Sequence, residues 1–260
     1  MGPRLAPALA VITLAALAGC GSGSRTSPVT SAAAVARLTS AAARSPVPPA
    51  PAALTVQAVR PTAAVVLPAP AIHQWPIPYG ARRRSEMAAY SQLHYGEHTA
   101  ALRNPKVIVE HFTETAGAEE AFNTFAPDVP DSEFHQLPGT CAHFIVERSG
   151  RIDQLVPLSL RCRHTVGLNW TAIGIEHVGF SDQAILGDRR QLEASLALTR
   201  WLRCTYRIAL KNVIGHNESL SSPYHHELVP AFQHQTHSDW NHADMVRYRA
   251  LLARLPCPGV

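Results

Sequence analysis

The sequence has no Cys-x-x-Cys pair, no internal repeat and no apolar run long enough to cross a bilayer comfortably. The first absence argues against a zinc cluster built from cysteines. Charged residues make up only 16% of the chain, and residues 21–74 contain no acidic residue. The net charge of +4 is ordinary, so it points to no particular partner, and we expect no nucleic-acid binding.

The first twenty residues have the anatomy of an export signal. Arg4 supplies a positive start, and an apolar run over residues 5–17 leads to a Leu-Ala-Gly-Cys ending at Cys20. Small residues before the cysteine favour cleavage over a permanent helix. The ending resembles the bacterial lipoprotein box, which implies lipidation of Cys20 and anchoring at the outer face of the cytoplasmic membrane. A plain secretory signal with an incidental cysteine is the alternative.

Residues 21–74 are rich in Ala, Pro, Ser and Thr. Four closely spaced prolines, Pro46, Pro48, Pro49 and Pro51, forbid a regular element in the middle of the segment. Such a composition cannot bury enough apolar surface to offset the entropy of ordering the chain. We therefore predict a disordered tether that lets a folded domain, residues 75–260, reach away from the membrane anchor.

From residue 75 onward, hydrophobic periodicity predicts a globular domain. The expected helices cover residues 82–95, 119–125, 188–206 and 243–255. The expected strands cover residues 106–112, 142–146, 152–156, 172–179 and 212–214. Ser149-Gly150 indicates a hairpin turn between two of these strands. Strands interleaved with helices, with one hairpin, predict an α/β domain in which a central mixed sheet is flanked by helices in three layers.

Apart from Cys20, the chain has four cysteines, Cys141, Cys162, Cys204 and Cys257. An even number in an exported protein predicts disulfides. Four cysteines allow three pairings, and the sequence does not choose among them rigorously. Because Cys141 and Cys162 flank the expected hairpin, that pair is favoured, and the other two cysteines would then join two late helices.

Polar side chains lie near the ends of three expected strands, where sites commonly open in α/β proteins. His111 ends the first strand, Glu176 lies among Ile, Val and Gly, and His216 follows Gly215. Burial would raise the pKa of Glu176 toward neutrality, which suits a general base. The alternatives are a structural histidine at His111 and a solvent-facing position for Glu176. With a carboxylate from residues 236–240, two imidazoles would make a catalytic zinc site.

These segments resemble, in the same order, the zinc-dependent N-acetylmuramoyl-L-alanine amidase family, which is shared with peptidoglycan recognition proteins and phage lysozyme-like amidases. The resemblance covers residues 75–255 and includes the central hairpin. It implies Zn²⁺ as the cofactor, held by His111, His216 and Asp239. His237 is a rival ligand in this histidine-rich loop. The sequence departs from the family because His237 stands where the family commonly has Lys, and no Pro follows Asp239.

The resemblance also implies roles for other residues. Glu176 matches the family's catalytic acid, and His237 would replace the lysine as a donor to the oxyanion. His164 and Asn169 match the pair that lines the family's substrate groove. His143 matches a position near the groove, where a core role is the alternative.

The implied reaction is hydrolysis of the amide between N-acetylmuramic acid and L-Ala of peptidoglycan stem peptides, by a monomeric enzyme at the cell wall. A peptidoglycan-binding sensor without activity and a zinc peptidase acting within the stem peptide are the alternatives, because a fold alone does not fix function.

Overall fold

The computed structural model describes residues 67–258 of the chain. The predicted signal peptide, lipidation at Cys20 and residues 21–66 of the predicted tether lie outside the described residues. Among residues 67–258, no helix combines the length and apolar character that a membrane span requires.

The described residues form a single six-stranded sheet with helices on both faces. The strands are β1 (His73–Gln74), β2 (Val107–Phe112), β3 (Phe144–Val146), β4 (Ile152–Gln154), β5 (Ala172–His177) and β6 (Val213–Gly215). The helices are α1 (Ala81–Tyr95), α2 (Ala118–Phe125), α3 (Asp182–Gly187), α4 (Arg189–Tyr206) and α5 (His242–Ala253). Three 3-10 helices complete them, η1 (Leu210–Asn212), η2 (His216–Ser221) and η3 (Pro230–Phe232).

The strand order is β1-β4-β3-β5-β2-β6. Strands β3, β5, β2 and β6 run parallel, β4 is antiparallel to β3, and β1 is parallel to β4. The sheet is therefore mixed, and the predicted fold class is confirmed. Strand β1 was not predicted, and it pairs with β4 just before the expected start of the domain at residue 75.

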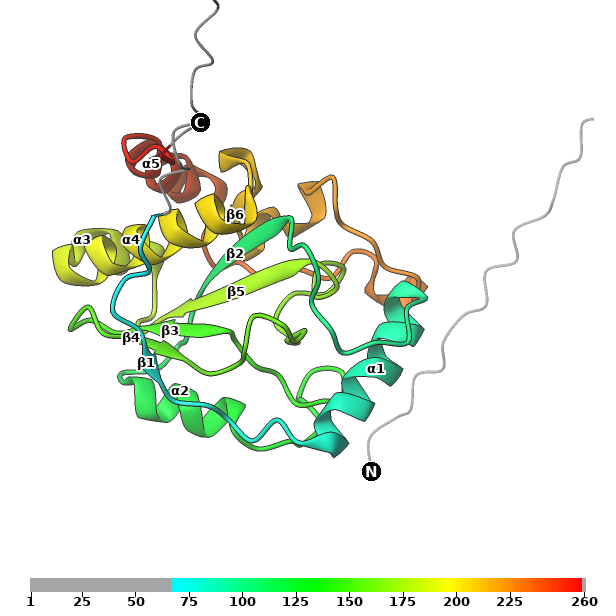
Figure 1. Cartoon of the computed structure of the whole chain (residues 1–260). Coiled ribbons are helices and arrows are strands. Elements are labelled where there is room, and N and C mark those ends of the chain that lie inside the picture. The colour runs from blue at the N-terminus through cyan, green and yellow to red at the C-terminus, as the bar shows by residue number, and fades with distance from the viewer. Residues whose placement is uncertain (1–66, 259–260) are drawn as a thin grey trace, which may run out of the picture. The chain divides into compact units, whose positions relative to one another are not determined.

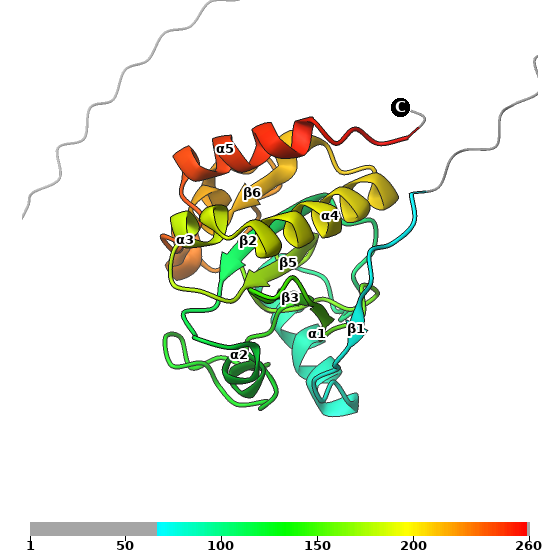
Figure 2. The same ribbon diagram turned by 90° about the vertical axis from the view of Figure 1, so that its left-hand side faces the viewer.

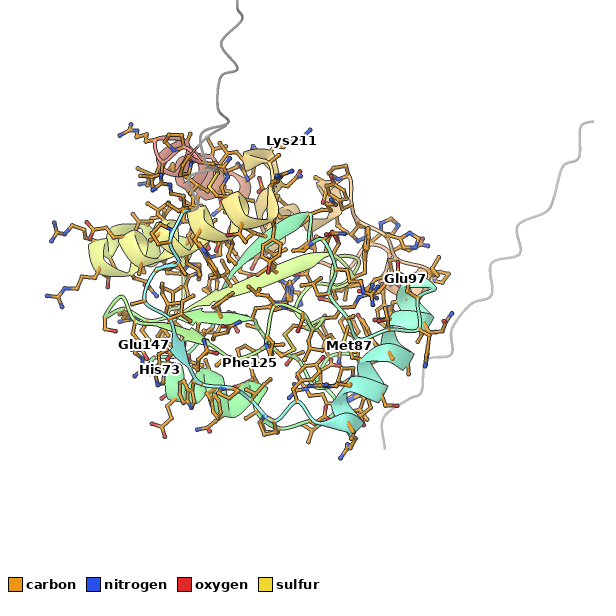
Figure 3. All side chains as sticks on the ribbon, in the orientation of Figure 1. His73, Met87, Glu97, Phe125, Glu147 and Lys211 are labelled. Atoms are coloured by element: carbon orange, nitrogen blue, oxygen red, sulfur yellow. A yellow bond between two sulfur atoms is a disulfide. The ribbon has the colours of Figure 1, made fainter. Side chains whose placement is uncertain are left out.

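Helices α1 and α2 cover one face of the sheet, and α3, α4 and α5 cover the other (Figures 1 and 2). Met87 of α1 and Phe125 of α2 are buried in the layer on the first face (Figure 3). Lys211 of η1 lies on the side of α4 and α5 (Figure 3). In the second layer, Ile173 and Ile175 of β5 pack in one apolar cluster with residues of α4 and α5. These two residues are two positions apart and so face the same layer, as the period of a pleated strand requires.

The two disulfides join Cys141 to Cys162 and Cys204 to Cys257, which confirms the favoured pairing. The first links the segment before β3 to the segment before β5. The second ties α4 to the segment after α5. Both close long loops of chain, which restricts the unfolded state and stabilises the fold.

Candidate functional site

The site lies where the parallel strands β2, β5 and β6 end at the same edge of the sheet. The register pairs His111 with Glu176 and Glu110 with Gly215. Paired residues of neighbouring strands face the same side, so the side chains of His111 and Glu176 lie next to each other. His216 follows β6 directly and begins η2. The fold thus brings together three residues that are far apart in the sequence.

His111, His216 and Asp239 form a buried cluster whose potential ligand atoms all lie within 4.8 Å of one another. His111 Nδ1 is 3.1 Å from Asp239 Oδ2, and His216 Nδ1 is 3.2 Å from Asp239 Oδ1. Two ligands of a tetrahedral zinc ion at about 2.05 Å would lie about 3.3 Å apart. The donor set and its spacing therefore fit a metal ion such as zinc.

The protonation states of Asp239 and His216 suit metal binding, whereas a metal ion would have to displace a proton from His111. Burial opposes ionisation of Asp239, but hydrogen bonds from His111 and His216 outweigh it and hold the pKa of Asp239 far below its ordinary value. Burial lowers the pKa of His216 to about 4. Burial also disfavours charge on His111, but the hydrogen bond to Asp239 outweighs it and raises the pKa of His111. A carboxylate and a neutral imidazole are the forms in which these side chains bind metals.

The second ring nitrogen of His111 faces His164. His111 Nε2 lies 3.1 Å from His164 Nδ1 and 3.3 Å from Thr165 Oγ1. Such a contact fixes the orientation of an imidazole whose other nitrogen binds a metal. Burial keeps the pKa of His164 well below its ordinary value, so this ring is neutral. Gly174 makes room for it, because a Cβ there would lie 2.7 Å from His164 Cγ.

Glu176 lies beside the cluster on β5 and is 8% exposed. Burial raises its pKa to about 7, so its carboxyl group can both accept and release a proton near neutral pH. Its buried Oε2 atom has no hydrogen-bond partner within the described part of the chain. Glu176 is thus free to bind a further group, such as a water molecule.

A groove of about 800 Å³ opens over these residues. Its wall opposite the strand ends is the segment 127–140, which precedes β3. The charged and histidine side chains along the groove are His111, Glu114, Asp131, Glu133, Arg163, His164, Glu176, His216, His237 and Asp239. The volume is in the range of ligand-binding sites, so the cluster faces a space that can hold a substrate.

His237 lies on the groove wall and does not join the buried cluster. Its ring stacks on His216 with centroids 4.7 Å apart, and its Nε2 atom is 3.1 Å from Glu133 Oε2. The side chain is about half exposed. Asp239, rather than His237, therefore occupies the third place beside the two histidines, while His237 is placed to reach a ligand in the groove.

The remaining predicted groove residues have different surroundings. Asn169 is fully buried, and its Oδ1 accepts hydrogen bonds from the backbone N–H groups of His164 and Thr165. His143 is also fully buried, with Nε2 bonded to Leu160 O and Nδ1 accepting from Gly174 N–H. Neither lines the main groove. Asn169 shapes the turn that carries His164, and His143 supports the strand that carries Glu176.

Two buried arginines that could not be selected from the sequence hold the groove wall. Arg83 of α1 donates to the carbonyl oxygens of Phe125, Gly139 and Thr140. Arg163 donates to the carbonyl oxygens of Gln136 and Pro138 and forms an ion pair with Asp131. Backbone acceptors leave no pattern in a sequence, so only the proximity of Arg163 to His164 could have drawn attention to it.

Residues 101–254, more than half of the chain, match the N-acetylmuramoyl-L-alanine amidase family. No curated protein sequence matches the chain.

Three similar solved structures are amidases. N-acetylmuramoyl-L-alanine amidase LysC from Clostridium intestinale URNW is 20% identical, covers 54% of this chain and 78% of its own, and has a TM-score of 0.35. AmiD from E. coli, solved with anhydro-N-acetylmuramic acid-L-Ala-D-gamma-Glu-L-Lys, is 25% identical, covers 46% and 51%, and has a TM-score of 0.35. A selenomethionine AmpD derivative is 20% identical, covers 68% and 93%, and has a TM-score of 0.43. On the family match, the chain belongs to the N-acetylmuramoyl-L-alanine amidase family.

Proposed function

We propose that this protein is a zinc-dependent amidase that hydrolyses the bond between N-acetylmuramic acid and L-Ala in peptidoglycan. The observation that carries the proposal is the convergence of His111, His216 and Asp239 beside Glu176 at the floor of a groove. Three nitrogen and oxygen ligands with an open fourth position are typical of catalytic zinc. The family match supplies the class of bond.

Zinc held by these three residues would supply a Lewis acid that lowers the pKa of a water molecule and polarises the substrate carbonyl. Glu176 accepts the proton of the attacking water and then delivers it to the leaving amine of L-Ala. Its pKa of about 7 suits both transfers, because a group that must accept and donate works best near the ambient pH. Glu176 is 8% exposed at the groove, so its carboxyl group has little contact with bulk water.

The groove residues around this centre have supporting roles in the proposal. His164 orients His111 through the contact between their ring nitrogens. His237 stands at the groove wall, where an N–H group could donate to the oxyanion that forms on the scissile carbonyl. Asn169 and His143 act indirectly, by holding the backbone around His164 and Gly174.

We further propose that a lipid at Cys20 anchors the protein, as a monomer, at the outer face of the cytoplasmic membrane. The signal anatomy before Cys20 supports this proposal. A lipid chain together with a long Pro-rich segment would place the groove within reach of the cell wall.

The direct test of the mechanism is the Glu176→Gln variant. Glutamine keeps the shape of the side chain but cannot accept the proton of water, so we expect full metal content and loss of peptidoglycan hydrolysis. Metal analysis and release of soluble wall fragments would measure both properties. Normal hydrolysis by this variant would refute the role of Glu176, and absence of metal from the unaltered protein would refute the zinc mechanism.

A further inference from the structure

The backbone carbonyl of His111 receives hydrogen bonds from two buried side chains. His177 Nδ1 lies 2.8 Å from His111 O, and Trp240 Nε1 donates to the same oxygen at 3.0 Å. Both side chains are 0% exposed. A carbonyl oxygen can accept more than one hydrogen bond, so both side chains can bond to it at once.

Each of the two donors directly follows a residue of the site in the sequence. His177 follows Glu176, the proposed base, and Trp240 follows Asp239, the proposed third ligand. One residue of each pair faces the groove, and the next lies in the layer of α4 and α5. The backbone oxygen of His111 therefore connects the end of β2 to the residues that directly follow Glu176 and Asp239.

Side chains of α4 and α5 in turn contact the two donors. His177 Nε2 lies 2.7 Å from Ser195 Oγ of α4, and Ser195 Oγ lies 2.7 Å from the hydroxyl of Tyr248 in α5. His111 O can only accept, so Nδ1 of His177 is the donor, and its Nε2 can accept from the serine hydroxyl. The Trp240 ring packs against His177 and Tyr248, at centroid distances of 5.1 and 5.2 Å.

The backbone around Trp240 is equally constrained. Asp182 of α3 accepts from the N–H of Trp240 at 2.8 Å, and Asp239 O accepts from Asn217 N–H at 3.0 Å. At Gly215 a Cβ would lie only 1.8 Å from Trp240 O. The residue before His216 must therefore be glycine for the segment with Asp239 to pass this closely.

We infer that His177 and Trp240 are positioning residues, which set the distances among His111, Asp239 and Glu176 by holding the His111 carbonyl from the side of the sheet opposite the groove. They touch neither the groove nor the metal ligand atoms. The inference rests on the proposed function for the identity of the site, but its measurement does not depend on activity. Outer partners of metal ligands commonly change metal affinity about 10- to 100-fold when they are removed.

The chain offers a matched control for the tryptophan. Trp170 Nε1 donates to the backbone oxygen of Tyr224 at 3.2 Å, so Trp170→Phe removes an indole–carbonyl hydrogen bond that does not involve the metal cluster. Trp240→Phe removes the bond to His111 O and keeps a ring in the core. We expect both variants to lose thermal stability, and only Trp240→Phe to bind metal more weakly, by about 10- to 100-fold.

The histidine can be tested by loss and rescue. His177→Leu removes the donor, whereas His177→Asn keeps an amide N–H near the place of Nδ1–H. We expect weaker metal binding and a lower kcat in the leucine variant, and recovery of most of both in the asparagine variant. Affinity would be measured for Zn²⁺ and Co²⁺ alone by competition with a chelator, on the full chain.

Two outcomes would overturn the inference. One is equal metal affinity in Trp240→Phe and Trp170→Phe at matched loss of stability. The other is unchanged metal affinity in His177→Leu. Failure of the proposed function would look different, because the variants would then bind metal as expected while the unaltered, metal-loaded protein leaves the muramoyl–L-Ala bond intact.

Discussion

Glu176 and Asp239 are both buried carboxylates at the same site, yet their pKa values move in opposite directions. Burial dominates at Glu176 and raises its pKa to about 7, whereas hydrogen bonds from His111 and His216 outweigh burial at Asp239 and lower its pKa. Different pKa values of neighbouring carboxyl groups separate their roles. Asp239 remains an anion that can bind a cation, and Glu176 can exchange a proton.

At the residue scale, the raised pKa of Glu176 predicts the pH dependence of hydrolysis. The base must be ionised before water attacks, so activity is lost as pH falls through the pKa of Glu176. We expect kcat/KM of the zinc-loaded enzyme to fall on the acid side with a midpoint between 4.5 and about 7, because the metal charge would pull the pKa down from the upper value. An activity that stays constant across this range would contradict the assignment.

The proposed third ligand, Asp239, gives a second prediction at this scale. Removing Asp239 leaves two imidazoles, whereas removing His237 takes away only a half-exposed ring on the groove wall. We expect the zinc content of purified protein to drop sharply in Asp239→Ala and little in His237→Ala, as measured by elemental analysis. The reverse pattern would make His237 the ligand.

At the scale of elements, strand β5 carries Glu176 and also provides the surface against which His164 rests. Gly174→Ala would place a methyl group 2.7 Å from His164 Cγ and displace this ring from His111. We expect lower zinc affinity and a several-fold lower kcat. Gly187→Ala is the matched control, because nothing lies within 4 Å of a Cβ there. Equal zinc affinity in the two variants would show that His164 does not support His111.

Strand β2 and helix α4 could be predicted from the sequence because each carries a clear hydrophobic pattern. The run Val107-Ile108-Val109 lies in β2, and the expected helix 188–206 is α4 with Asp188 as its N-cap. The elements that were missed are short. Strand β1 has two residues and α3 has six, too few to show a period, although Ser181 caps α3 through its hydroxyl.

The site could be predicted only in part, for a related reason. The apolar runs predict the strands that carry His111 and Glu176. The resemblance of these segments to the amidase family then implies roles for both residues. The groove wall, by contrast, depends on Arg83 and Arg163 donating to backbone oxygens of residues 125–140. The contacts of His177 and Trp240 with the His111 carbonyl likewise involve a backbone atom, which every residue possesses.

At the scale of the whole molecule, the three-layer domain places the cluster of His111, His216 and Asp239 at one edge of the sheet, and the Cys141–Cys162 disulfide braces a segment beside it. Cys162 precedes Arg163 and His164 directly, so the Cys141–Cys162 bond ties these groove residues to the start of the hairpin. The second bond ties α4 to the chain beyond α5. The pairing of β2 with β5 and β6 brings the site residues together, and the first disulfide adds a link beside them.

The proposed anchor makes a prediction at this scale. The signal anatomy predicts that Cys20 carries the lipid, so Cys20→Ala should remove lipid labelling and release the protein from the membrane fraction. Metabolic labelling with a fatty acid, followed by fractionation, would measure both effects. An unaltered protein that takes up no label would instead support a plain secretory signal.

The most direct test of the central claim is mass spectrometry of peptidoglycan digested by the zinc-loaded protein. We expect free stem peptides that begin at L-Ala, intact glycan chains, and no such products with Glu176→Gln. Stem peptides cut internally, or intact peptidoglycan after incubation with the zinc-loaded protein, would contradict it.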